Sequence, residues 1–405
     1  MRVLLLTETF LPEIGGGEQQ AQLLSQTLAR RGHDVTIVTR RSRRDLPREQ
    51  LRDGVRIIRI GPAGRGRWKK WGLAVSAISP LTRLHAGVDV VFVSGYRIMG
   101  VPAVVVAQVL GRKCVLKADS PGEMSGEFFR AGLAPLRLQP TSFGVHLMIR
   151  FRNALLRRAD AFVAISSPIA AELQSSGVPV ERIQYVPNGV DTARFRPALP
   201  AERAALRDRL GFPRGPIAVY TGRLVSYKGL TLLLRVWCEL CRSGVSGTLV
   251  LVGAGSTDMH NCEDMLRQYV DRHGLGDRVI FTGGVDNVDE HLRAADVFVF
   301  PTEKEAFGVS LVEAMACGLP SVATRVGGIA DFLVDGANGL VVEPGSFTQL
   351  RDALVTLLAG GDRVTALGHA ARTTALGRFS ADTVADRYLK VFESLRDSRV
   401  AEVAS

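Results

Sequence analysis

Two glutamates, Glu305 and Glu313, stand eight residues apart in the stretch FVFPTEKEAFGVSLVEAMACGLPSVAT. A buried strand is predicted to end at Pro301 and a helix to run from about Gly308 to Ala316, so Glu305 falls in a loop and Glu313 two turns into the helix. Carboxylates accept hydrogen bonds from sugar hydroxyls, and a helix N-terminus offers amides to a phosphate or sugar oxygen. We expect a ligand site here; the alternative is a capped helix with a solvated face.

Two cations, Arg223 and Lys228, lie in the stretch TGRLVSYKG, between a predicted strand and the helix that follows it. Their spacing allows both side chains to converge on one diphosphate and to neutralise the charge that grows as a phosphate leaves. Two surface cations are uninformative by themselves. Their position at a strand end before a helix favours phosphate binding.

A glycine run, Gly15 to Gly17, precedes a helix predicted to start near Glu18. Glycines let a ligand approach the backbone, and the helix N-terminus adds free amides and a positive dipole end. The same run is also typical of an ordinary turn. On this motif alone both interpretations stay open.

Regular alternation of strands and helices supplies the elements that position these residues. Short β-branched runs begin near residues 3, 35, 55, 88, 113, 161 and 182, and helical apolar spacing appears in 18–31 and 144–158. This alternation predicts an α/β fold whose parallel sheet is covered on both faces. In open sheets of this kind ligands bind at the carboxyl ends of the strands, where all three motifs fall.

The segment 186–202, VPNGVDTARFRPALPAE, interrupts the alternation with three prolines and an Asn-Gly turn, and we predict that it links two domains. Strand runs then restart near residues 216, 248, 278, 295, 319 and 338. The prediction is two Rossmann-like domains, 1–196 and 197–379, with closing helices from about Ser346 and from Ser380. The basic stretches RRSRRDLPREQLR and GRGRWKKW are expected to be loops.

Composition describes a globular chain. Of its 405 residues 46% are hydrophobic and 22% charged, and this length is too great for one ordinary core. The start, MRVLLLTETF, has neither the long apolar run nor the cleavage site of a secretory signal, and no later run is long enough to span a bilayer. We therefore expect a cytoplasmic protein.

The five cysteines are few and scattered, which favours reduced thiols over a disulfide framework. Cys238 and Cys241 form a CxxC, with His260 and Cys262 following, so a zinc site is conceivable. However, the pair lies in TLLLRVWCELC, which is predicted to be an amphipathic helix, and no second CxxC accompanies it. We expect no metal.

Taken together, the motifs closely resemble the family-4 retaining glycosyltransferases of GT-B fold. The resemblance is carried by the Glu305–Glu313 spacing within EAFGVSLVEAMACGLPSVATRVGGIADFLVDGANGLVVEPG, by TGRLVSYKG, by the linker VPNGVDTARFRP and by the N-terminal glycine turn. It runs nearly end to end and is strongest from about Asp160 to Gly345. It implies two Rossmann-like domains facing across a cleft, with a C-terminal helix of about 380–405 crossing back to the first domain.

The resemblance also implies a donor site in the second domain. Arg223 and Lys228 would bind the diphosphate of a nucleotide sugar, Glu313 the ribose hydroxyls, and Glu305 the donor sugar. Gly16 and its neighbour Gly17 would lie against the phosphate or the acceptor from the first domain. Further contacts to the donor sugar are implied for the backbone of Phe307, Gly308 and Val309. The family usually needs no metal and no cofactor.

One position departs from the family. Many relatives place a histidine near the sugar after the fifth strand, whereas this strand reads KCVLKADSPGE and puts Asp119 at about the matching place. Asp119 would then belong to the catalytic set with Glu305, Arg223 and Lys228, where it orients the sugar 6-hydroxyl or the acceptor. The alternative is that it caps a turn.

The function that we expect is retaining transfer of a hexose from a UDP- or GDP-sugar to a glycan, lipid-linked or small-molecule hydroxyl, in cell-envelope or polysaccharide biosynthesis. A nucleotide-sugar epimerase of the same fold and a non-catalytic nucleotide-sugar-binding module are the alternatives. A dinucleotide dehydrogenase is disfavoured, because VGAGS at 252–256 lacks the third glycine. Nucleic acid is not expected as a partner.

Positive charge is concentrated in the first half. Residues 1–196 hold 29 Lys and Arg against 15 Asp and Glu, a net charge of +14, while 197–405 carry −3. Basic residues attract anionic lipid, and tryptophan favours the membrane interface. We expect a peripheral contact with an anionic membrane; a basic surface that only aids solubility or grips the acceptor is the alternative. The residues in question are Arg40, Arg41, Arg43 and Arg44 in one stretch and Arg65, Arg67, Trp68, Lys69, Lys70 and Trp71 in another.

Overall fold

The computed structural model describes residues 1–13, 15–64, 67–129, 142–255 and 259–404. The chain divides into two compact units. Met1–Gly189 and Ala381–Ser405 form the first, and Val190–Ser380 forms the second. The division after Gly189 lies within the stretch 186–202, whose prolines and Asn-Gly pair break the strand–helix alternation.

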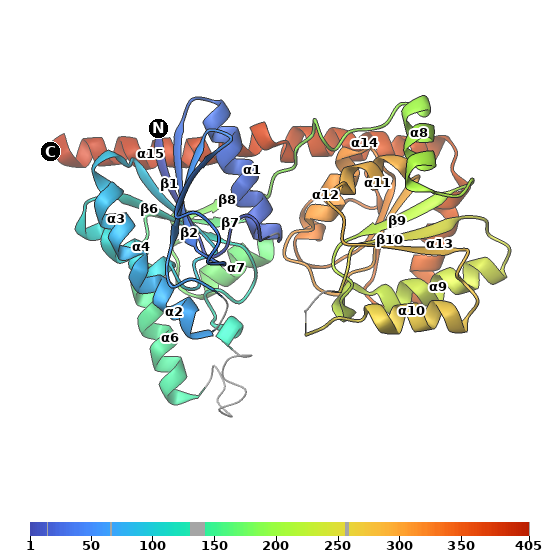
Figure 1. The fold of residues 1–405 in the computed structure, drawn as a ribbon, viewed down its shortest axis with the longest axis horizontal. Helices are drawn as coiled ribbons and strands as arrows, with labels where there is room; N and C mark the ends of the chain where they lie inside the picture. Colours follow the sequence, from blue (N-terminus) through green and yellow to red (C-terminus); the bar gives the residue numbers. More distant parts are fainter. Residues whose placement is uncertain (14, 65–66, 130–141, 256–258, 405) are drawn as a thin grey trace. The chain divides into compact units, whose positions relative to one another are not determined.

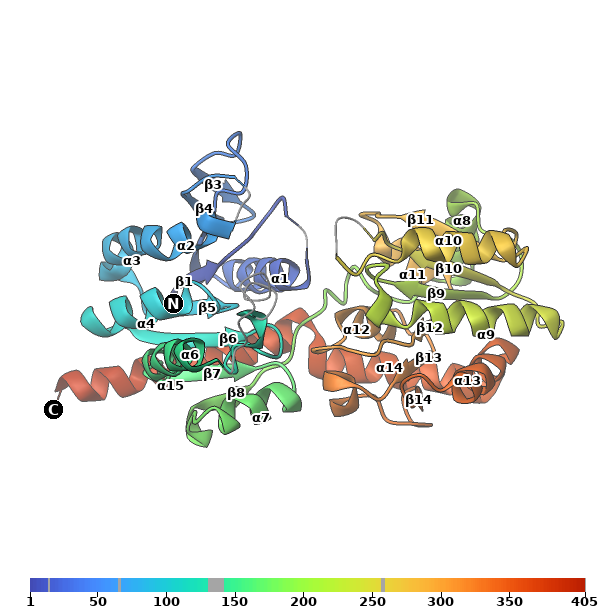
Figure 2. The same cartoon turned by 90° about the horizontal axis from the view of Figure 1, so that it is seen from below.

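The first unit is built on an eight-stranded sheet in the order β3-β4-β2-β1-β5-β6-β7-β8, parallel except for β3 (Figures 1 and 2). Its central strands are buried along nearly their whole length, which is why they appear in the sequence as continuous apolar runs. The strands are β1 (Arg2–Thr7), β2 (Asp34–Arg40), β3 (Glu49–Arg52), β4 (Val55–Ile60), β5 (Val90–Ser94), β6 (Lys113–Ala118), β7 (Ala161–Ala164) and β8 (Ile183–Tyr185).

Helices flank this sheet, and the last of them comes from the end of the chain. Helix α15 (Ala381–Ala404) packs in the core of the first unit, with Tyr388 and Phe392 against Phe92 of β5 at ring-centroid distances of 5.2 and 5.6 Å. The other helices of the unit are α1 (Gly16–Arg30), α2 (Arg67–Ser76), α3 (Ile78–Leu84), α4 (Gly100–Val109), α6 (Phe143–Leu156) and α7 (Ser167–Ser175).

The second unit holds a six-stranded parallel sheet in the order β11-β10-β9-β12-β13-β14. Its strands are β9 (Ile217–Thr221), β10 (Thr248–Val252), β11 (Val279–Gly283), β12 (Val297–Phe300), β13 (Ser321–Thr324) and β14 (Leu340–Val342). Its helices are α8 (Pro200–Leu210), α9 (Leu230–Arg242), α10 (Glu263–Arg272), α11 (Val288–Ala294), α12 (Val309–Ala316), α13 (Phe347–Ala359) and α14 (Asp362–Phe379).

Both sheets reverse their strand order at one point, between β1 and β5 in the first unit and between β9 and β12 in the second. Open α/β sheets bind ligands at such a reversal, outside the carboxyl ends of the strands. The turn after β6, which neighbours β5, lies at this edge of the first sheet, and the loops after β9 and β12 lie at this edge of the second. The α/β prediction with two doubly wound sheets is confirmed.

Three local predictions were wrong. The stretch 40–52 is not all loop, because Glu49–Arg52 pairs antiparallel with β4 through a tight turn in which Asp53 and Gly54 have φ of 50° and 76°. Residues from Arg67 onward form α2 rather than a loop. Three helices follow Ser346, not two, because Gly360 and Gly361, both at positive φ, separate α13 from α14.

Candidate functional site

Lys228 forms the centre of the polar group in the second unit. It ends the short 3-10 turn Ser226–Lys228 after β9, and its Nζ lies 2.6 Å from Glu305 Oε2. The ammonium also lies 5.2 Å from the Phe300 ring centroid and 5.7 Å from that of Tyr227. An ammonium held between a carboxylate and two aromatic rings is restricted to one position.

Arg223 lies two residues beyond the end of β9. Its Nη2 donates a hydrogen bond to Tyr227 Oη at 2.8 Å, and its carbonyl accepts one from Tyr220 Oη at 2.9 Å. Tyr227 thus contacts both cations that the sequence singled out. The structure places Arg223 and Lys228 on the same short loop at the carboxyl end of a central strand.

The loop that carries Glu305 is pressed between two glycines. A Cβ on Gly229 would lie 1.9 Å from the carbonyl oxygen of Pro301, and one on Gly327 would lie 1.7 Å from that of Glu305. Both glycines have positive φ, at 70° and 50°, so any other residue would be strained and would clash. This close approach brings Glu305, which also accepts a hydrogen bond from the Ala306 amide at 3.0 Å, to Lys228.

Helix α12 begins directly after this loop. Gly308 precedes it with φ of 103°, and Val309 is its first residue, so the first amides of the helix lack partners within it. Phe307 is buried against Phe332 and Phe379, with ring centroids 5.4 and 5.6 Å away, and fixes the entry of the helix. The N-terminus is therefore anchored beside Glu305 and can receive an anion or a sugar oxygen.

Glu313 is the second glutamate of the motif and lies on α12. Burial raises the pKa of its carboxyl to about 7; Arg194 acts in the opposite direction, and Asp289 adds to the increase. Within the described part of the chain this carboxyl makes no hydrogen bond. Because it has no hydrogen bond to the protein to break, this carboxyl can accept hydrogen bonds from the hydroxyl groups of a ligand.

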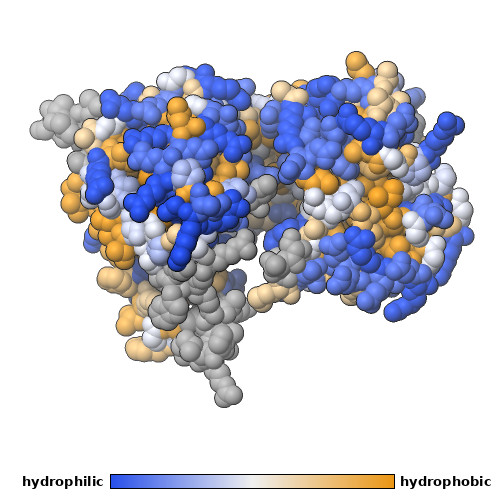
Figure 3. Space-filling model, in the orientation of Figure 1, coloured by the Kyte–Doolittle hydropathy of each residue, from blue (hydrophilic) through white to orange (hydrophobic). Residues whose placement is uncertain are grey.

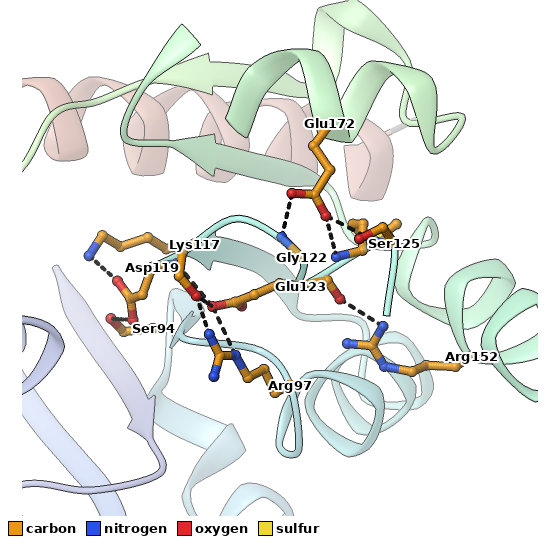
Figure 4. Close-up of polar contacts among 11 residues, drawn as sticks. Ser94, Arg97, Lys117, Asp119, Gly122, Glu123, Ser125, Arg152 and Glu172 are labelled. Atoms are coloured by element: carbon orange, nitrogen blue, oxygen red, sulfur yellow. Dashed lines mark hydrogen bonds and ion pairs between the residues drawn. The ribbon is translucent and has the colours of Figure 1, made fainter. Parts of the chain in front are cut away.

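In the first unit the structure brings the glycine run and Asp119 together. Helix α1 begins at Gly16, and a Cβ on Gly17 would lie 3.4 Å from Asp119 Oδ2. Asp119 follows β6 directly, accepts a hydrogen bond from Ser94 Oγ at 3.0 Å and forms an ion pair with Lys117 (Figure 4). Lys117 and Ser94 also line a small pocket with Gln20 and Tyr388.

The turn after β6 contains polar residues that the sequence analysis missed. Glu123 is only 1% exposed; its Oε1 lies 3.4 Å from Arg97 Nε and accepts a hydrogen bond from the Asp119 amide at 3.3 Å (Figure 4). Burial raises its pKa to about 7, although Arg97 acts against this. Glu172 fastens the same turn by accepting the amides of Gly122, Met124 and Ser125 at 2.7 to 3.1 Å.

A signal for this network was present in the sequence. KCVLKADSPGE places a lysine inside an otherwise apolar strand and a glutamate four residues beyond Asp119. A charged residue at a buried strand position needs a partner, and here Asp119 provides it for Lys117.

The described residues contain no group of three His, Cys, Asp or Glu side chains arranged to hold a metal ion. Cys238 and Cys241 lie on α9, which is the amphipathic helix expected there, and Cys238 is buried in the core. Burial raises the pKa of the Cys241 and Cys262 thiols.

Of the basic stretches, Arg40 is buried at the end of β2, whereas Arg43 and Arg44 are exposed. Arg41 is tied down by hydrogen bonds to the carbonyls of Leu46, at 2.8 Å, and Arg44. Arg65 and the side chains of 67–71, which include both tryptophans of the predicted membrane contact, lie outside the described residues. Among the helices that the structure describes, none is both long and apolar enough to cross a bilayer.

Two family models match this chain. The one described as Glycosyltransferase Family 4 matches residues 14–194, and the one described as Glycosyl transferases group 1 matches residues 215–360. The second match contains Arg223, Lys228, Glu305 and Glu313; the first contains Gly16, Gly17 and Asp119.

Curated relatives show the same similarity. The GDP-mannose-dependent alpha-(1-6)-phosphatidylinositol monomannoside mannosyltransferase of Mycobacterium tuberculosis is 34% identical over 59% of this chain, and the matched part spans 64% of its own length. The D-inositol 3-phosphate glycosyltransferase of Acidothermus cellulolyticus is 30% identical over 96% of this chain and 88% of its own length.

Among solved structures, the Anabaena protein HepE in complex with UDP superposes with a TM-score of 0.75. The match covers 97% of this chain and 100% of that one at 20% sequence identity. At this identity the likeness concerns the fold.

Proposed function

This chain belongs to glycosyltransferase family 4, of GT-B fold, and from that premise we propose that it transfers a hexose from a UDP- or GDP-sugar to a hydroxyl acceptor with retention of configuration. The observation that carries the proposal is the Lys228–Glu305 pair at 2.6 Å beside Arg223. It combines positive charge suited to a diphosphate with a carboxylate suited to sugar hydroxyls, at the carboxyl ends of β9 and β12.

We propose that the second unit holds the donor. Arg223 and Lys228 contact the diphosphate, Glu313 accepts hydrogen bonds from the ribose, and Glu305 contacts the hexose. The backbone amides of Phe307, Gly308 and Val309, at the start of α12, are proposed to contact the hexose together with Glu305. A relative of similar sequence is named as GDP-mannose-dependent, and a protein of similar fold was solved with UDP. Both support a nucleotide-sugar donor, and guanine and uracil remain the candidate bases.

The first unit is proposed to bind the acceptor. Asp119 is held by Lys117 and Ser94, and its Oδ2 lies close to Gly17 in the first turn of α1. From there it would orient the acceptor hydroxyl or the hexose, while the amides of Gly16 and Gly17 approach a phosphate or the acceptor. Asp119 stands where many relatives carry a histidine, so it would work as an acceptor of hydrogen bonds.

In the proposed reaction the bond between the anomeric carbon and the diphosphate oxygen breaks, and a bond to the acceptor oxygen forms on the same face. The acceptor's proton passes to the departing phosphate oxygen. Negative charge grows on the diphosphate during this step, and Lys228 and Arg223 lie on the loop where we place it. Fixed cations that face developing charge lower the barrier without reorganising. No metal is required for this role.

The test is incubation of the full chain with UDP- and GDP-sugars, first alone and then with candidate glycan, lipid-linked and small-molecule acceptors. We expect slow donor hydrolysis with one base and one sugar, and a glycoside whose anomeric configuration matches the donor's. An inverted product would contradict the retaining mechanism. An epimerised nucleotide sugar formed without acceptor would favour the epimerase alternative, and donor binding without turnover would favour a binding module.

The cellular role that we propose is cell-envelope or polysaccharide biosynthesis at the cytoplasmic face of the membrane, with peripheral attachment. Support comes from the net charge of +14 on residues 1–196 and from a relative whose named acceptor is a phosphatidylinositol monomannoside. An acceptor of that kind is confined to a membrane surface, so an enzyme that meets it there gains from a weak, salt-sensitive attachment.

A further inference from the structure

Helix α6 (Phe143–Leu156) buries two polar side chains beside the apolar Val145, Ile149 and Leu156. Its buried face includes Arg152 and Asn153, which donate hydrogen bonds to the carbonyls of Glu123 at 2.9 Å and Met124 at 2.7 Å (Figure 4 shows Arg152). A surface helix normally turns such side chains outward. Here the turn after β6 requires donors for its carbonyls, and α6 supplies them from the face that packs on the unit.

The outward face of α6 is consequently apolar. Phe143, Leu147 and Phe151 follow one another at a spacing of four residues, which places them on one side of a helix, and they are 87%, 58% and 68% exposed. The neighbouring helix α4 adds Val109, 79% exposed, and its Gln108 Nε2 donates to the carbonyl of Arg158 just beyond α6 at 3.3 Å. Figure 3 shows hydrophobic residues over α4 and α6 on the face drawn.

The charge on and directly after α6 has one sign. The described stretch 142–159 has four arginines and neither aspartate nor glutamate. Arg150, which precedes Phe151 on α6, and Arg158, two residues beyond the end of the helix, are both exposed. A contiguous apolar surface bordered by polar groups marks an interaction site. Exposed arginines beside such a surface favour an anionic partner and oppose the pairing of two identical copies.

We propose that the outward face of α6 is a membrane-docking surface, with Phe143, Leu147 and Phe151 entering the interface of an anionic bilayer and Arg150 and Arg158 at its headgroups. An interfacial helix has this arrangement, with aromatic and aliphatic residues on one face and arginine along the border. The inference rests on the peripheral placement proposed above, and it assigns that contact to α6. It does not depend on which sugar is transferred.

The first test is co-sedimentation with phosphatidylcholine vesicles that lack or contain phosphatidylglycerol. The variant Phe143→Ser/Leu147→Ser/Phe151→Ser should lower the partition coefficient on anionic vesicles at least about tenfold, because three apolar side chains no longer leave water. A matched control is Leu199→Ser/Val334→Ser, which removes two exposed apolar residues of the second unit and should bind as the parent does.

Charge is tested separately with Arg150→Glu/Arg158→Glu. Loss of two basic residues near an anionic surface should weaken binding on the order of tenfold or more, and the effect should vanish at high salt. The control Arg214→Glu/Arg272→Glu reverses two exposed arginines of the second unit and should have little effect. Equal binding of every variant to neutral and anionic vesicles would overturn the proposal.

A spectroscopic arm locates the helix in the lipid. Phe151→Trp, in a background with Trp68→Phe and Trp71→Phe, leaves the buried Trp237 as the other indole. With anionic vesicles, its emission should shift to the blue and be quenched by brominated acyl chains. Emission unchanged by vesicles would mean that α6 stays in water and would overturn the inference.

The remaining outcomes separate the inference from its premises. If replacing Trp68 to Trp71 by Ser abolishes vesicle binding while the α6 variants bind normally, the protein attaches to the membrane but not through α6, and the proposal is wrong. If the parent dimerises in sedimentation velocity and Phe143→Ser/Leu147→Ser/Phe151→Ser does not, a second copy covers this face and the proposal is wrong. Turnover with a water-soluble acceptor should stay unchanged in the α6 variants. This assay therefore reports on glycosyl transfer separately from membrane binding.

Discussion

Each unit carries a lysine–carboxylate pair at the carboxyl end of its sheet, and the two pairs have different surroundings. In the second unit Lys228 and Glu305 come from loops after different strands, and the ammonium lies near two aromatic rings. In the first unit Lys117 and Asp119 come from one strand and the turn after it, and Ser94 also holds the aspartate. The arrangement in the second unit fixes a cation, and the arrangement in the first unit fixes an anion.

Each unit also holds a second carboxyl, Glu123 in the first and Glu313 in the second, and burial raises the pKa of both to about 7. Glu123 is bound by Arg97 and the Asp119 amide, whereas Glu313 has no hydrogen-bond partner in the described part of the chain. Equal pKa values therefore accompany different roles. Glu123 belongs to the fold of its turn, and Glu313 remains available to a ligand.

The largest effect is expected from the cations of the second unit. Lys228→Ala and Arg223→Ala should each lower kcat by about a hundredfold with the fold retained, because loss of one electrostatic contact to developing charge costs on the order of 3 kcal/mol. Steady-state kinetics with circular dichroism measures this. Lys304→Ala, an exposed lysine of the neighbouring loop, is the matched control and should turn over normally. Near-parental kcat in both variants would show that the diphosphate does not bind at this loop.

The anion of the first unit should matter less and in a different parameter. Asp119→Asn keeps the shape of the side chain but removes the charge, and we expect kcat to fall about tenfold with the donor KM unchanged. The buried Lys117 then loses its ion-pair partner, so thermal stability should fall as well. If the additional variant Lys117→Met restores stability and kcat together, Asp119 only caps the turn and the comparison between the two pairs fails.

These two pairs also show what the sequence could predict. Lys228, Arg223 and Glu305 stand in loops after clear strand runs, and Glu313 lies on the helix that follows one of these loops, so their positions follow from the alternation of elements. The contact of Gly17 with Asp119 could not be predicted, because it joins residues about a hundred positions apart through the order of strands in a sheet. Likewise β3 was missed because its four residues are mostly exposed and polar, and only the Asp-Gly turn indicated a hairpin.

Donor binding should depend on pH through Glu313. Its carboxyl is ionised above pH 7 and protonated below, and the ionised form accepts the stronger hydrogen bonds from ribose hydroxyls. The donor KM should therefore rise severalfold, up to about tenfold, as pH falls from about 8 to 6. In Glu313→Gln the KM should be higher and flat across this range. An unchanged slope in the variant would assign the titration to another group.

Glu123 should affect stability in the same pH range. Its folded-state pKa of about 7 lies above the 4.5 of an exposed glutamate, so the folded chain binds more protons between these values. This group therefore lowers the stability of the fold as pH rises from about 4.5 to 7. Its shift corresponds to about 3 kcal/mol between the two limits.

The variant Glu123→Gln removes that titration. Its free energy of unfolding relative to the parent should improve from pH 5 to pH 8, even where loss of the Arg97 contact makes it less stable at both. Urea unfolding at the two pH values measures the difference. A constant difference between variant and parent would show that the carboxyl does not titrate in this range.

The smallest expected effect is that of a chelator. Metal-dependent transferases use a bound divalent ion to neutralise the leaving diphosphate. Arg223 and Lys228 lie on one loop here, and we propose that they neutralise the diphosphate in place of an ion. Turnover in EDTA should equal turnover in buffer. The variant Lys228→Ala makes the test sharper, because added magnesium should raise its rate only if the ion can take the place of the lysine. Loss of parental activity in EDTA that magnesium or manganese restores would mean that these side chains do not carry the charge stabilisation.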